Sequence, residues 1–127
     1  MKKTLALMVA GMIFAGGVAS AAVFIVTNVN DNGAGSLRQA ILSANASPGA
    51  NTINFNIPGG GVQTIAPTNA LPDITNAVAI NGYSQPGSSA NTLTNGDNAV
   101  LLIRLDGARI TSGLPAGLNF TAGASGS

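Results

Sequence analysis

One pair of charged side chains is spaced so that the two residues could act together in chemistry. Arg104 and Asp106 stand two positions apart in the aliphatic segment 100–106. On a β-strand they project from the same face, opposite Ile103 and Leu105, because side chains alternate between the two faces. The pair could form half of a carbohydrate site, but glycoside hydrolysis normally uses two carboxylates that flank the bond. We therefore favour an exposed ion pair or a position in a stack of equivalent residues.

Two clusters of Asn and Asp carry the oxygen ligands that calcium prefers. Asn30-Asp31-Asn32 and Asn95-Gly96-Asp97-Asn98 each hold a single carboxylate. Tight calcium sites usually collect several carboxylates, so turn formation and helix capping are the favoured roles. Gly33-Ala34-Gly35 precedes a helical pattern, but it has neither the GxGxxG spacing nor the lysine of a phosphate loop. The sequence thus predicts no catalytic residue, no metal site and no cofactor site.

The remaining candidates are single residues without partners of matching chemistry. Tyr83 is the sole tyrosine and follows Asn81-Gly82. It could stack on a sugar ring, but we expect it to be a plug packed over a coil of the fold. Arg38 and Arg109 are isolated in the sequence, and we expect them to be solvated or bonded to carbonyl groups.

The composition excludes most familiar active sites. The chain has 127 residues, of which 7% are charged and 4% aromatic, and it contains no His, Cys, Trp or Glu. Imidazole bases, thiolate nucleophiles and His/Cys metal sites are therefore ruled out. Because the formal net charge is only +1, we expect no nucleic-acid partner. We predict one modest domain, or part of one, that is not an enzyme.

The first 21 residues have the pattern of a secretory signal peptide. A basic start, Lys2-Lys3, precedes the apolar residues 5–18, and Ala19-Ser20-Ala21 supplies the small residues of a cleavage site. A spanning helix needs about 20 apolar residues, so a membrane anchor is the less favoured alternative. We predict cleavage after Ala21, export to the cell surface or the medium, and no membrane span in the mature chain.

One amphipathic helix and several short strands are expected after the signal peptide. Apolar residues recur with the period of a helix at Leu37, Ala40, Ile41 and Ala44. Ser36 is placed to cap the start of this helix, and Gln39 to complete a capping box. Strands are expected at 23–29, 52–57, 62–65, 78–81 and 100–106, with a further short one at 118–121. The helix is too short to be stable alone, so its apolar face must pack against other elements.

Three of the expected strands repeat at a constant spacing of 25 residues. The matched positions are Ile53, Val78 and Ile103; Phe55, Ile80 and Leu105; and Asn56, Asn81 and Asp106. Such a period, with short strands and turns, predicts a parallel β-solenoid whose coils stack about 4.8 Å apart. The helix would then cover the first coil, with Leu37 and Ile41 over the core. The alternatives are a β-sandwich with chance spacing and an α+β domain whose helix packs on a sheet face.

The sequence also resembles a known group of exported proteins. Residues 28–41, NVNDNGAGSLRQAI, and 51–59, NTINFNIPG, resemble the start of right-handed parallel β-helix repeat proteins of the pectate-lyase-like superfold. The similarity continues through 80–87, INGYSQPG. Residues 35–40, GSLRQA, resemble the CSLREA-type N-terminal motif of that group, but Gly35 replaces its Cys and Gln39 its Glu. Any role of the thiol or the carboxylate is therefore not carried over.

This resemblance and the repeat together imply an all-β fold, a right-handed parallel β-helix of about three coils with an N-terminal amphipathic capping helix. Residues 1–21 would be the signal peptide, 22–49 the first strand and the capping helix, and 50–127 the first coils of a truncated β-helix. Because the group includes adhesin-like and autotransporter-like proteins, we expect a non-catalytic cap serving adhesion or surface display, with surface carbohydrate or a neighbouring cell as its partner. The alternative is the N-terminal part of a polysaccharide lyase or hydrolase whose active site lies downstream.

Overall fold

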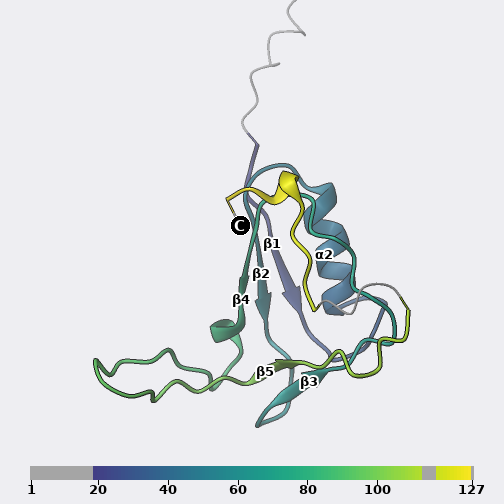
Figure 1. Ribbon diagram of the computed structural model, residues 1–127. Helices are drawn as coiled ribbons and strands as arrows, with labels where there is room; N and C mark the ends of the chain where they lie inside the picture. Colours follow the sequence, from purple (N-terminus) through teal and green to yellow (C-terminus); the bar gives the residue numbers. More distant parts are fainter. Residues whose placement is uncertain (1–18, 113–116, 127) are drawn as a thin grey trace, which may run out of the picture.

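The computed structural model describes residues 19–112 and 117–126, which form short strands, one α-helix and two 3-10 turns (Figure 1). The strands are β1 (Val23–Val26), β2 (Asn51–Phe55), β3 (Gln63–Ile65), β4 (Val78–Asn81) and β5 (Ile103–Leu105). The α-helix is α2 (Leu37–Ala46), and the 3-10 turns are η3 (Gly82–Ser84) and η4 (Ala122–Ala124). The signal-peptide prediction falls mainly on residues 1–18, which lie outside the described residues.

The described strands make two parallel sheets. One has the order β1-β2-β4, and the other pairs β3 with β5. Figure 1 shows the second sheet beyond the C-terminal end of β2. A single parallel bridge between Ile74 and Phe120 lies outside the named strands. Every strand pair therefore joins segments that are far apart in the sequence.

Alternation of apolar side chains places one face of the first sheet in the core. In β1, Val26 is buried, whereas Val23 and Ile25 are 60% and 52% exposed. In β2, Ile53 and Phe55 are buried. Strands rich in β-branched and aromatic residues suit such a half-buried pleated surface. The buried residues of both sheets and of α2 form one hydrophobic cluster, so β1 and α2 share a core with the segments that follow residue 50.

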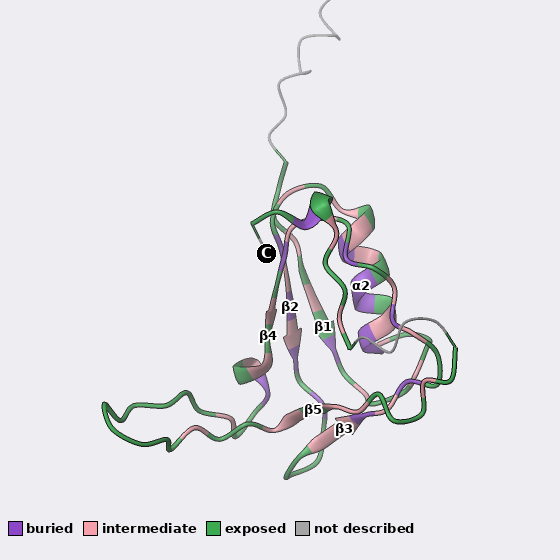
Figure 2. Ribbon diagram, viewed as in Figure 1, coloured by how far each residue is buried: buried purple, intermediate pink, exposed green. Residues whose placement is uncertain are grey.

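Helix α2 forms where its apolar spacing predicts it and buries the predicted face against β1 and β2 (Figure 2). The buried residues are Leu37, Ala40, Ile41 and Ala44. The Ser36 side chain accepts a hydrogen bond from the Gln39 N–H at 3.2 Å, which confirms the predicted N-cap. The Gln39 side chain instead donates to Ser43, so the reciprocal half of the predicted capping box is wrong.

The predicted 25-residue stacking is also wrong. Asn51 pairs with Val78 and Ile53 with Ile80, a spacing of 27 residues. Strand β5 does not join β4 at all, because it pairs with β3, where Ile103 lies beside Gln63. The expected stack of Asn56, Asn81 and Asp106 is consequently absent from the described residues, and Asn81 pairs with Asn54.

Strand β5 pairs with β3, and not with β4, because of the path that the chain takes between β4 and β5. After η3 the chain runs outward from the sheets, and Ser89 and Val100 make an antiparallel bridge that brings it back (Figure 1). Residues 103–105 therefore return beside β3 and not beside β4. The expected all-β, right-handed parallel β-helix of about three coils is contradicted, because the described residues form no closed solenoid. They form a small mixed α/β fold of a three-stranded parallel sheet, a two-stranded parallel sheet and one packed helix.

Candidate functional site

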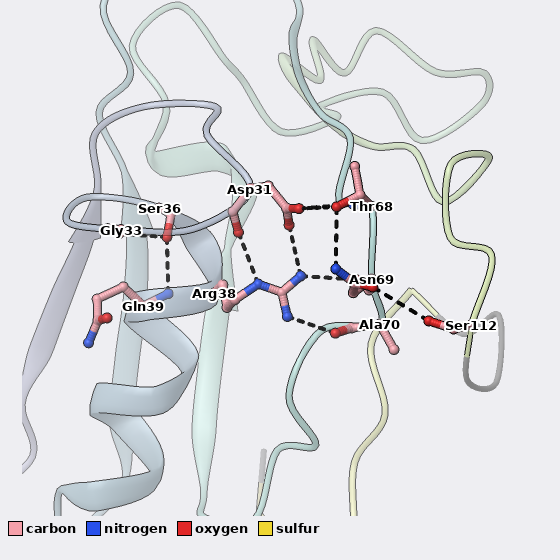
Figure 3. A network of polar contacts seen from close by, with 9 residues as sticks. All are labelled: Asp31, Gly33, Ser36, Arg38, Gln39, Thr68, Asn69, Ala70 and Ser112. Atoms are coloured by element: carbon pink, nitrogen blue, oxygen red, sulfur yellow. Dashed lines mark hydrogen bonds and ion pairs between the residues drawn. The ribbon is translucent and has the colours of Figure 1, made fainter.

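A group of charged and polar contacts links the turn after β1, the start of α2 and residues 68–70 (Figure 3). Arg38 Nη2 lies 2.8 Å from Asp31 Oδ1, and Arg38 Nε donates to the Asp31 carbonyl at 3.0 Å. The same guanidinium donates to the carbonyl groups of Asn69 and Ala70 at 2.9 and 2.7 Å. Asp31 Oδ2 accepts from the Thr68 N–H and hydroxyl at 3.1 and 2.5 Å. We call Asp31, Arg38 and residues 68–70 the clamp.

The clamp keeps the Asp31 carboxyl ionised, with both of its oxygens hydrogen-bonded. Hydrogen bonds from the Thr68 side chain, then from Arg38 and the Thr68 N–H, lower the pKa of the Asp31 carboxyl from 3.8 to about 2. Both carboxylate oxygens already accept internal donors, and the side chain is 22% exposed. A carboxylate with a pKa this low is a poor general base near neutral pH. The chemistry of the clamp is therefore the fastening of one segment to another.

Asparagine side chains fasten the opposite end of α2. Asn51 Nδ2 donates to the carbonyl groups of Ala44 and Ser47 at 3.0 and 2.8 Å, and Asn76 Nδ2 donates to the same two carbonyls. Asn45 donates to the Asp73 carbonyl and accepts from the Thr75 N–H. The last carbonyls of a helix have no partner within the helix, and the Asn51 and Asn76 amides supply donors to that of Ala44 and to that of Ser47 just beyond the helix. Helix α2 is thus tied to the rest of the fold at both ends.

The loop that enters α2 requires glycine at position 35. Gly35 has φ +78°, and a Cβ there would overlap Thr27 Oγ1 and Asn28 Nδ2. Its carbonyl accepts from the N–H groups of Thr27 and Asn28, which brings the two stretches of backbone together. A side chain at this position, including the Cys of the motif that the sequence resembles, would both clash and strain the backbone.

Most of the residues that the sequence singled out act locally. Arg104 Nη2 lies 3.3 Å from Asp106 Oδ2, and the Arg104 side chain is 64% exposed, which confirms the favoured exposed ion pair. Asp97 accepts from the Ala99 N–H, as expected for a turn. Tyr83 is 45% exposed in η3, so its predicted role as a packed plug is wrong.

The two arginines expected to be isolated have different surroundings. Arg109 is exposed, as predicted. Arg38 bonds to carbonyl groups as predicted, but it also pairs with Asp31, and the sequence carries no signal for that pairing.

Two polar side chains are buried and bonded to backbone groups in a way that the sequence does not predict. Gln85 is 1% exposed, and its amide accepts from the Ile57 N–H at 2.9 Å and donates to the Ile57 carbonyl at 2.7 Å. Asn51 is 2% exposed and also accepts from the Ala22 N–H at 3.0 Å. Each amide bonds to backbone groups next to a strand, Gln85 to those of Ile57 after β2 and Asn51 to that of Ala22 before β1. These partners are distant in the sequence, so only the folded chain reveals them.

No family model, curated protein or solved structure matches this chain. The resemblance to β-helix repeat proteins and to the CSLREA-type motif therefore remains a prediction. Across the described residues, no group of three or more His, Cys, Asp or Glu side chains is arranged to hold a metal ion. The same residues include no helix with the length and apolar character that a membrane crossing needs.

Proposed function

We propose that this chain is a non-catalytic structural module of an exported protein, serving adhesion or display at the cell surface. The clamp supports this proposal, because Asp31 and Arg38 use their charged groups to hold α2 against residues 68–70. The asparagines at the other end of α2 act in the same way. The role of these polar side chains is to hold α2 in place against β1 and β2.

Export is supported by the start of the chain. The basic residues, the apolar stretch and Ala19-Ser20-Ala21 have the order of a signal peptide. Ala22 is held in the fold, since its N–H donates to Asn51 and its carbonyl accepts from the Thr52 N–H. Cleavage after Ala21 would therefore leave a mature chain that begins at Ala22, the first of the described residues that is bonded to β2.

Mass spectrometry tests the export half of the proposal. The chain is produced from all 127 residues in an export-competent bacterial host, and its mass is measured after recovery from outside the cytoplasm. We expect a mature chain that begins at Ala22. Ala19→Arg should block cleavage, because a large charged residue replaces a small one at the cleavage site, whereas Ala10→Leu within the apolar stretch should not. An uncleaved chain retained in the cytoplasm would contradict export.

Surface display is tested on intact cells that produce the chain, and the absence of catalysis is tested on the exported chain. Protease added to intact cells should digest the exported chain, and incubation with acidic or neutral polysaccharides should leave their chain length unchanged. Depolymerisation that disappears in Asp106→Asn would overturn the proposal in favour of a carbohydrate-active enzyme. Protection of the chain from protease on intact cells, with digestion after lysis, would overturn surface display.

A further inference from the structure

Among the described residues, one edge of strand β5 has no neighbouring strand. On the other edge, the Gln63 N–H donates to the Leu102 carbonyl at 2.7 Å, and the Asp106 N–H donates to the Ile65 carbonyl at 2.9 Å. Because backbone groups point alternately to the two edges of a strand, those of Ile103 and Leu105 point away from β3. Among the described residues, β3 is the only strand neighbour of β5. The N–H and C=O groups of Ile103 and Leu105 are thus directed at the edge that no described strand covers, which we call the open edge.

The hydrophobic core is less completely covered beside this edge. Ile53, Ile65 and Ile74 are at most 1% exposed. By contrast, Ile103 and Leu105 are only partly buried, as is Ile80 in β4. Helix α2 packs against β1 and β2, on the side of the first sheet away from β4. The end of the core formed by β4 and β5 is therefore only partly covered, since Val78 is 3% exposed but Ile80, Ile103 and Leu105 are not fully buried.

The charges along β5 are complementary to themselves. Arg104 and Asp106 flank Leu105 and project from the face opposite the core. If a second β5 lay antiparallel with its Leu105 opposite Leu105, each Arg104 would face Asp106 of the second copy. Opposite charges directly across an antiparallel pair stabilise it, and a two-fold axis creates this contact twice. The existing Arg104–Asp106 contact is exposed, so exchanging it between copies costs little.

We propose that the open edge of β5 docks against the β5 edge of a second copy of this chain, as an antiparallel strand pair centred on Leu105. The backbone groups of Leu105 then bond to those of Leu105 in the second copy, and the two β3-β5 sheets become one continuous sheet. The strand is short, so the dimer is weak and forms at roughly 10 µM to 1 mM chain.

Sedimentation equilibrium tests this docking on the mature chain recovered from cells expressing all 127 residues. We expect a monomer–dimer equilibrium that Arg104→Asp weakens roughly tenfold or more, since both attractive contacts become repulsive. Arg109→Asp is the matched control, because it makes the same charge change at an exposed arginine outside β5, and it should change the dissociation constant less than about twofold. Far-ultraviolet circular dichroism checks that both variants are folded.

Hydrogen exchange provides a second readout that does not depend on a substitution. The amide of Leu105 should become more protected as chain concentration rises, and Arg104→Asp should remove that concentration dependence. A chain that stays monomeric up to about 1 mM, with concentration-independent exchange at Leu105, would overturn the proposal. A dimer that Arg104→Asp and Arg109→Asp affect equally would overturn it as well, because association would then use another surface.

Discussion

At the Asp31 carboxylate, donors from two separate segments meet one acceptor. Thr68 supplies its hydroxyl and its N–H, and Arg38 supplies its guanidinium. These contacts favour the ionised form and lower the pKa of this carboxyl from 3.8 to about 2. Because the folded pKa lies below the unfolded one, the stabilising effect is complete above about pH 4 and is lost as the pH falls toward 2.

The first prediction concerns acid stability. The free energy of unfolding should fall by about 1 to 2 kcal/mol between pH 4 and pH 2 through Asp31 alone, a figure reduced for the partial exposure of this side chain. Urea unfolding followed by circular dichroism at a series of pH values measures it. Asp31→Asn should flatten this part of the profile, whereas Asp97→Asn, at an exposed turn, should keep it. If the free energy of unfolding of Asp31→Asn fell just as steeply between pH 4 and pH 2, Asp31 would not be the source of the acid sensitivity.

At the scale of elements, α2 depends on fastenings as well as on its apolar face. Its ten residues are too few for a stable isolated helix, and Leu37 and Ile41 supply packing against the sheet. Arg38 adds bonds to residues 69 and 70, which belong to no strand or helix. These bonds are the direct link between the start of the helix and the segment that runs beside it.

The second prediction tests this link. Arg38→Ala should lower the free energy of unfolding by about 1 to 3 kcal/mol, because it removes charge-assisted bonds and leaves Asp31 without its cation. Arg38→Lys should restore only part of the loss, since one ammonium group cannot span the four acceptors. Arg109→Ala should change stability by less than about 0.5 kcal/mol. Equal losses in Arg38→Ala and Arg109→Ala would refute the clamp.

The sequence predicted these local elements well. The apolar spacing in α2 and the cap at Ser36 depend on residues within one or two turns of each other, so they are visible in the chain itself. Two carbonyl partners of Arg38, those of Asn69 and Ala70, lie 31 and 32 positions away in a segment with no regular pattern. Nothing in residues 68–70 distinguishes them from any other turn before the fold brings them to α2.

At the scale of the whole molecule, strand register escaped sequence analysis for a geometric reason. Spacings of 25 and 27 differ by two residues, which leaves every side chain of a strand on the same face. Ile53 and Ile80 are therefore paired core positions at the true spacing, although Ile53 and Val78 also matched in the sequence. The pairing of β5 with β3 depends on the path of residues 82–102, and apolar alternation within the strands carries no information about that path.

The third prediction follows from the length of chain that each strand pair closes. Ile25 pairs with Asn54, Thr64 with Arg104, and Ile74 with Phe120, so nearly all sheet contacts are non-local. Such topologies fold in roughly milliseconds to seconds, because loop entropy is lost before the contacts form. Stopped-flow circular dichroism after dilution from urea measures the rate. Complete refolding within about 100 µs would contradict the non-local topology.

Gln85 lends its side-chain amide to Ile57 in the way that the peptide group of a neighbouring strand would. The N–H and C=O groups of Ile57, in the segment after β2, are thereby hydrogen-bonded by Gln85. The chain then runs outward from the sheets, and it returns to pair with β3 at β5. The stretch between Gln85 and β5 is consequently anchored at both ends, and the Ser89–Val100 bridge joins its two arms. We expect a foreign peptide inserted between Asn95 and Gly96 to break the bonds that Asn91 and Thr92 make across the tip of this stretch, while β3 and β5 stay paired.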